Sequence, residues 1–196
     1  MELIRELYNR GVIRFGDFVL QSGLKSPIYL DMRLVPSEPE LFKHFIELAL
    51  KELEKLDVDC VIGVATGGLV WSSVIAYEKG LPHLYVRSEE KQHGTSSLIE
   101  GRTMAGQRAV VVDDVATTGS SIIRAVEACR SKGVVVEHAL VLVDREQGAT
   151  LKMSRTGVVL HRCFTLTEIL ITLAQNKIAE EKLIRGVLNW HASQNA

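Results

Sequence analysis

Two adjacent carboxylates and a run of hydroxyl-bearing residues stand together in the middle of the chain. Asp113 and Asp114 follow an apolar stretch at 110–112, and Thr-Thr-Gly-Ser-Ser occupies 117–121. We expect a strand over 108–113, then a loop, then a helix from Ser120. Backbone N–H groups at a helix start bind anions together with hydroxyls, and Gly119 allows close approach of a phosphate. The two carboxylates would repel that phosphate unless they face sugar hydroxyls or a metal ion.

A second loop of the same kind is Ala65-Thr66-Gly67-Gly68. It lies between an expected strand at 58–64 and an expected helix at 69–78. Gly-Gly turns are common, so this loop is evidence for an anion site only in combination with the first one. Neither loop is a GxxxxGK[ST] or a GxGxxG motif.

Apolar strands alternate with helices along the chain, which favours an α/β fold with a mostly parallel sheet covered on both faces. Ligands bind such sheets beyond the carboxyl ends of the strands. Ser37 with Glu40 predicts a capping box at the start of a helix. The other expected helices cover 2–10, 69–78, 120–132, 166–176 and 178–191, and the strands lie within 17–33 (two) and at 58–64, 83–87, 108–113, 134–143 and 160–163.

Residues 88–106 break this alternation, because they are polar, punctuated by glycine and long. Loops of more than about 12–15 residues in compact domains are usually functional or disordered. We therefore expect a mobile loop here that acts as a lid.

Composition and charge argue against nucleic-acid and membrane partners. The formal net charge is −1, so the basic excess of a nucleic-acid binder is missing. There is no apolar run of about 18 residues and no signal-like start, so we expect no membrane partner and a cytoplasmic location. The three cysteines are far apart, which favours reduced thiols. The length of 196 residues fits a single domain over 1–196.

The stretch 110–121 closely resembles the phosphoribosyl-diphosphate (PRPP) signature of type I phosphoribosyltransferases. The resemblance implies their fold, with a small N-terminal hood formed mainly by about 1–35 with C-terminal elements. It also implies that Ala65, Thr66, Gly67 and Gly68 form a pyrophosphate loop. PRPP would contact Asp113, Asp114, Val115, Ala116, Thr117, Thr118, Gly119, Ser120 and Ser121.

Three further stretches resemble orotate phosphoribosyltransferases and follow the expected order along the chain. They are the N-terminal segment 15–29, the catalytic loop that starts at Arg87, and the turn 144–149. The resemblance implies that Lys25, Thr117 and Arg145 contact orotate, and that Lys25, Arg87, Lys91 and His93 contact PRPP. An arginine suits the orotate carboxylate because it binds in a bidentate manner.

The same resemblance implies a reaction in which the base nitrogen attacks the anomeric carbon of PRPP and pyrophosphate leaves. Lys91, His93 and Asp114 would be the catalytic residues. Mg²⁺ would be carried mainly by PRPP, with a contact from Asp113 or Asp114 and no protein cage. The family is usually a homodimer whose catalytic loop, about 88–106, reaches the neighbouring subunit's site.

Two alternatives stay open, namely a phosphoribosyltransferase for another base and a non-catalytic PRPP-sensing regulator. Lys25 and Arg145 favour an anionic base, and an intact Lys91–His93 segment favours catalysis. The chain departs from many relatives at Ser88 and near Gly67, where they carry lysine. These departures affect the expected PRPP affinity more than the reaction type.

Overall fold

The computed structural model describes residues 2–19, 23, 25–88 and 98–194. The chain divides into two compact units, 1–44 with 164–196 (the terminal unit) and 45–163 (the central unit). The central unit contains most of α2 (Pro39–Leu53), then β3 (Cys60–Val64), α3 (Gly67–Lys79), β4 (His83–Val86), β5 (Ile99–Glu100), β6 (Arg108–Ala116), α4 (Ser120–Arg130), β7 (Val135–Asp144), α5 (Ala149–Ser154) and most of β8 (Val159–Thr165).

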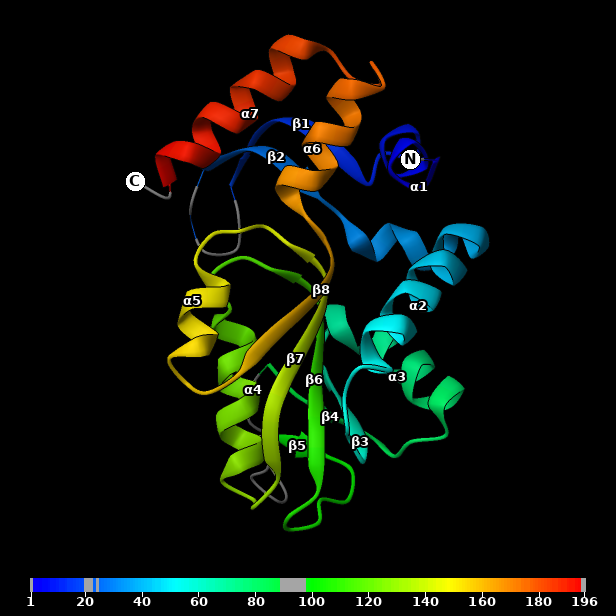
Figure 1. The fold of residues 1–196 in the computed structure, drawn as a ribbon, viewed down its shortest axis with the longest axis vertical. Coiled ribbons are helices and arrows are strands. Elements are labelled where there is room, and N and C mark those ends of the chain that lie inside the picture. The colour runs from blue at the N-terminus through cyan, green and yellow to red at the C-terminus, as the bar shows by residue number, and fades with distance from the viewer. Residues whose placement is uncertain (1, 20–22, 24, 89–97, 195–196) are drawn as a thin grey trace. The chain divides into compact units, whose positions relative to one another are not determined.

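The central unit is built on a six-stranded sheet with the order β5-β4-β3-β6-β7-β8. β4, β3, β6 and β7 run parallel, and β5 is antiparallel to β4. In Figure 1, α4 and α5 lie on one side of this sheet and α3 lies on the other. The predicted α/β class with a mostly parallel, two-sided sheet is therefore confirmed.

Side chains alternate between the two faces of the sheet, as a strand period of two requires. Ile62 and Val111 belong to a buried cluster with Ile122 and Val126 of α4. Gly63 faces the other way, where a Cβ atom would meet Ser72 of α3. All of β3 is buried, which explains its uninterrupted apolar sequence.

In its described residues, the terminal unit contains a two-stranded hairpin, three α-helices and one 3-10 helix besides the start of α2. These elements are α1 (Glu2–Asn9), β1 (Ile13–Val19), β2 (Lys25–Leu30), the 3-10 helix η1 (Met32–Ser37), α6 (Leu166–Gln175) and α7 (Glu181–Gln194). α7 contacts β2, and Ile184 and Val187 are buried residues of α7. None of the described helices has the length and apolar character that a membrane span needs.

The predicted capping box at Ser37 is wrong. Ser37 closes η1, and its hydroxyl donates to the Leu34 carbonyl oxygen at 2.6 Å, while α2 begins later, at Pro39. A capping box does occur at α6, where the Glu168 N–H donates to Thr165 Oγ1 at 3.0 Å. In return, the Thr165 N–H donates to the Glu168 carboxylate at 2.7 Å.

Strand β6 is longer than predicted. It continues to Ala116, paired with Asp144 of β7, so Asp113 and Asp114 lie inside the strand and not at its end. The predicted loop 88–106 also contains a short strand, β5, whose Ile99 pairs with Val86. In both places, backbone pairing with a neighbouring strand produces strand structure that the local composition did not indicate.

Candidate functional site

The acidic pair sits within β6, and its two carboxylates have different surroundings. Asp113 is buried, and its carboxylate accepts the backbone N–H of Asp114 at 2.9 Å and the Ser121 hydroxyl at 3.1 Å. Asp114 is only partly buried, and it accepts the Val115 N–H at 2.8 Å. The Ser121 contact ties the end of the predicted phosphate loop to the acidic pair.

Burial raises the pKa of the Asp113 carboxyl well above its ordinary value, and the neighbouring Asp114 carboxylate raises this pKa further. The bond from Ser121 acts in the opposite direction but is a smaller effect. Titratable groups with strongly shifted pKa values are concentrated at functional sites. A cationic or hydroxyl-bearing ligand beside the pair would relieve the repulsion between the two carboxylates.

The loop 117–121 connects β6 to α4 and is held from outside by α5. Gly119 has φ +74°, a conformation that favours glycine, and a Cβ atom there would lie 2.8 Å from Met153 Cε. The Thr118 and Ser120 hydroxyls are 3.0 Å apart, and the Lys152 ammonium donates to Ser120 Oγ at 2.9 Å. The predicted anion loop therefore presents hydroxyls, a helix start and a cation together.

The second loop lies directly against the acidic pair. The peptide bond between Ala65 and Thr66 is cis, and α3 begins at Gly67. A Cβ atom on Gly67 would lie 2.6 Å from both Asp114 carboxylate oxygens. The structure thus brings together two loops that are far apart in sequence, at the carboxyl ends of the adjacent parallel strands β3 and β6.

The predicted orotate turn, 144–149, joins the same site through the backbone. The Arg145 N–H donates to the Ala116 carbonyl oxygen at 2.8 Å, just before the phosphate loop. The buried Asp144 carboxylate accepts the Glu146 N–H at 2.8 Å and the Thr150 hydroxyl at 3.1 Å, which fixes the turn to the start of α5. Arg145 is 3% exposed, so its charge acts in a medium of low dielectric constant.

Two further predicted cations, Arg87 and Lys25, lie in different units of the chain. Arg87 follows β4, and its guanidinium lies 3.6 Å from the Glu100 carboxylate, while Ser88 after it is exposed. Lys25 is exposed at the start of β2 in the terminal unit, opposite Val19. Lys91 and His93 fall outside the described residues.

Two residues near the site were not assigned a role from the sequence. Lys152 lies on α5, a helix that the pattern did not predict, so no signal pointed to it. Gln147 lies within the turn 144–149, and both polar atoms of its amide are buried with no hydrogen-bond partner among the described residues. Such groups are rare in native structures and are associated with functional sites.

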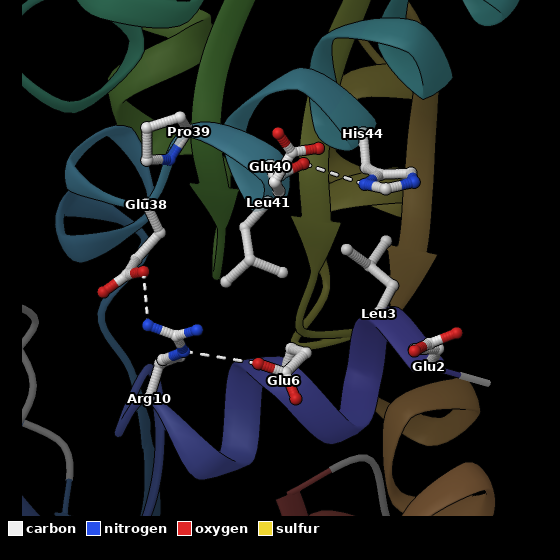
Figure 2. Close-up of a pocket in the computed structure, with 9 residues that line it drawn as sticks. All are labelled: Glu2, Leu3, Glu6, Arg10, Glu38, Pro39, Glu40, Leu41 and His44. Atoms are coloured by element: carbon white, nitrogen blue, oxygen red, sulfur yellow. Dashed lines mark hydrogen bonds and ion pairs between the residues drawn. The ribbon is translucent and has the colours of Figure 1, made fainter.

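A separate pocket of about 280 Å³ lies in the terminal unit, between α1 and the segment 38–44 (Figure 2). Arg10 bridges Glu38 at 2.6 Å and Glu6 at 3.3 Å along one side of it. None of the predicted site residues lines this pocket. Among the described residues, no group of three or more His, Cys, Asp and Glu side chains is arranged to hold a metal ion.

The fold and the site define a class of protein. The family model described as "Phosphoribosyl transferase domain" matches residues 35–171. This range includes both anion loops, the acidic pair and the Arg145 turn, and it shows that the chain has a phosphoribosyltransferase domain.

Relatives with this domain narrow the class. An orotate phosphoribosyltransferase from Pyrobaculum islandicum is 43% identical over 97% of this chain and 98% of its own length. Another, from Staphylothermus marinus, is 41% identical over 96% of this chain and 94% of its own length. The crystal structure of orotate phosphoribosyltransferase from Aeropyrum pernix is similar with a TM-score of 0.80 and 45% identity, covering 88% of this chain and 98% of that one. The chain belongs to the orotate phosphoribosyltransferase family.

Proposed function

We propose that this chain transfers the ribose 5-phosphate group from PRPP to orotate, giving orotidine 5'-monophosphate and pyrophosphate in pyrimidine biosynthesis. The observation that carries the proposal is the convergence of the loops 65–68 and 117–121 on the acidic pair. The bond from the Arg145 N–H to the Ala116 carbonyl oxygen, which ties the turn 144–149 to the start of the loop 117–121, supports the proposal of a base site there. The family relationship supports the same reaction.

The substrate groups match the chemistry of the site. The 5-phosphate would take the hydroxyls and N–H groups of 117–121, and the pyrophosphate would take those of 65–68. The ribose hydroxyls would donate to Asp113 and Asp114. Orotate carries a carboxylate, for which Arg145 and Lys25 are suitable cations, and Thr117 is a further base contact.

Catalysis would depend on charge stabilisation and positioning. Lys91, His93 and Arg87 would balance the charge that grows on the departing pyrophosphate. Asp114, the more accessible carboxylate of the pair, would stabilise the positive ribosyl centre. The short distances among the loops would hold the two substrates in line.

Mg²⁺ fits this site as an ion carried by PRPP. The donors present are carboxylate and hydroxyl oxygens, which are the ligands that Mg²⁺ prefers. Asp113 or Asp114 would contact the ion or its water, and bound Mg²⁺ would neutralise charge on the pyrophosphate. Ser121 and the Asp114 N–H keep the Asp113 carboxylate oriented for that contact.

We further propose a cytoplasmic homodimer in which the segment with Arg87, Lys91 and His93 completes the partner's site. This arrangement would combine residues of two chains in each active site. Subunit mixing distinguishes this arrangement from a site built from one chain.

The reaction is tested directly with purified protein, PRPP, Mg²⁺ and orotate. Loss of orotate absorbance together with release of pyrophosphate is the expected result. Turnover with a purine or with uracil, but none with orotate, would overturn the choice of base. PRPP binding without turnover of any base would favour the PRPP-sensing regulator.

The proposed role of Lys91 is tested with Lys91→Ala. We expect kcat to fall strongly while Tm stays near that of the wild type, because the change removes no buried group of the described core. Lys132→Ala, a matched loss of an exposed lysine, should leave both values unchanged. Wild-type kcat in Lys91→Ala would remove this residue from catalysis.

A further inference from the structure

We infer that Lys152 binds the 5-phosphate of PRPP, although this residue lies outside the PRPP signature. This inference rests on the proposed function of the loop 117–121. Lys152 is exposed on α5, and its ammonium donates to Ser120 Oγ at 2.9 Å. A cation at this position faces the loop that is proposed to bind a doubly charged phosphate.

The position of Lys152 is determined by packing beneath it. Met153, the next residue, is fully buried, and the absence of a side chain on Gly119 leaves room for the terminal methyl group of Met153, Cε. Ala149 contacts the same glycine, where a Cβ atom would lie 3.3 Å from Ala149 Cβ. α5 is therefore seated on the phosphate loop, and this contact sets where the lysine can reach.

The start of α5 is held by a second set of contacts. Asp144 accepts a hydrogen bond from the Thr150 hydroxyl at 3.1 Å, and the Lys152 N–H donates to the Gly148 carbonyl oxygen at 3.0 Å. The short helix is thus anchored at both ends, at β7 and at Gly119. A lysine on an anchored helix loses less freedom on binding than one on a loose loop, which favours a contribution to affinity.

The chemistry agrees with this geometry. The helix start and the hydroxyls of 117–121 are neutral donors, and the Asp113 carboxylate accepts the Ser121 hydroxyl at 3.1 Å. A phosphate monoester placed there needs a positive charge to offset that carboxylate. Lys152 supplies it, and the Ser120 hydroxyl, which accepts from the ammonium, can at the same time donate its own proton to a phosphate oxygen.

Binding measurements with ribose 5-phosphate and with pyrophosphate separate the two ends of PRPP. We expect Lys152→Gln to weaken the binding of ribose 5-phosphate about tenfold or more, since a charge-assisted bond is lost. Lys152→Arg should restore most of the affinity, and pyrophosphate binding should be unchanged in both variants. Lys132→Gln, with the same change of charge on an exposed residue, should bind ribose 5-phosphate like the wild type.

A purely structural role through Ser120 makes a different prediction. If Lys152 only orients Ser120, Lys152→Gln should have no effect in a Ser120→Ala background, whereas direct contact predicts a further loss. Unchanged affinity for ribose 5-phosphate in Lys152→Gln, or no binding of it by the wild type, would overturn the inference. Failure of the proposed function is distinguished from this, because it would appear as missing orotate turnover while the binding measurements stand.

Discussion

A Cβ atom on Gly67 would lie 2.6 Å from both carboxylate oxygens of Asp114. This relationship explains why position 67, in the proposed pyrophosphate loop, is a glycine. Any side chain at Gly67 must displace the Asp114 carboxylate, which accepts the Val115 N–H at 2.8 Å. The loop and the acidic pair therefore restrict each other.

The two glycines of this loop should respond differently to alanine. In Gly67→Ala the new Cβ atom would clash with the end of the Asp114 side chain, which can move aside. We therefore expect a large loss of kcat/KM with a small change in Tm. Gly68→Ala meets backbone, because its Cβ would overlap the Val112 carbonyl oxygen and lie 2.8 Å from Asp113 Cα. We expect Gly68→Ala to lower Tm clearly in calorimetry. Equal Tm values for the two variants would contradict this account.

Asp113→Asn tests the raised pKa of the buried carboxyl. A carboxyl whose pKa is raised by folding costs stability once the pH exceeds its ordinary pKa of 3.8, and the cost grows up to the folded pKa. Asparagine cannot ionise, so the Tm of Asp113→Asn relative to wild type should be higher at pH 8 than at pH 4. Calorimetry across this range measures the difference, and the opposite trend would argue against a raised pKa. PRPP affinity should fall, since the variant loses the proposed sugar contact.

Thr165→Ala removes the capping box of α6. Loss of a side-chain cap costs about 1 kcal/mol, which lowers Tm by about 2–4 °C in a protein of this size. Ser37→Ala is the matched control, because the Ser37 hydroxyl bonds only within η1 and caps no helix in the described structure. A larger loss in Ser37→Ala than in Thr165→Ala would contradict the assignment.

The three cysteines should react slowly in the folded protein. Burial raises the pKa of Cys60 to about 11 and the pKa values of Cys129 and Cys163 to about 12. At pH 8 a thiol of pKa near 11 is ionised only to roughly one part in a thousand, and the thiolate is the reactive form. Iodoacetamide followed by mass spectrometry should show little modification of the native protein and full modification in denaturant.

Subunit mixing tests the proposed shared site. Lys91→Ala chains and Asp113→Asn chains should each have low activity. If Lys91 acts in the partner's site, exchange between the two variants creates dimers with one intact site, and activity should rise above that of either parent. Each variant mixed with itself is the control for activity, and native mass spectrometry of the two variants together follows the exchange. No recovery despite exchange would argue that each site is built from one chain.

Local patterns in the sequence were sufficient for much of the fold. The apolar stretch before Asp113, the helix after Gly119 and the helix predicted at 69–78 depend on neighbours within a few residues, so propensity and periodicity predicted them. The errors at β6 and Ser37 had different causes, a distant strand for β6 and a local hydrogen bond for Ser37. β6 extends through Val115 and Ala116 because β7 continues beside it, and Ser37 caps no helix because η1 takes its hydroxyl.

The sequence by itself determined the chemical identity of the site. Asp113, Asp114 and the residues 117–121 are adjacent in the chain, so their donors and acceptors come together in any fold that keeps the strand–loop–helix order. The tertiary structure decided which other residues join them. Gly67 against Asp114, Arg145 beside Ala116 and Lys152 at Ser120 are contacts between separate segments, and they result from strand pairing and from the packing of α5 on Gly119.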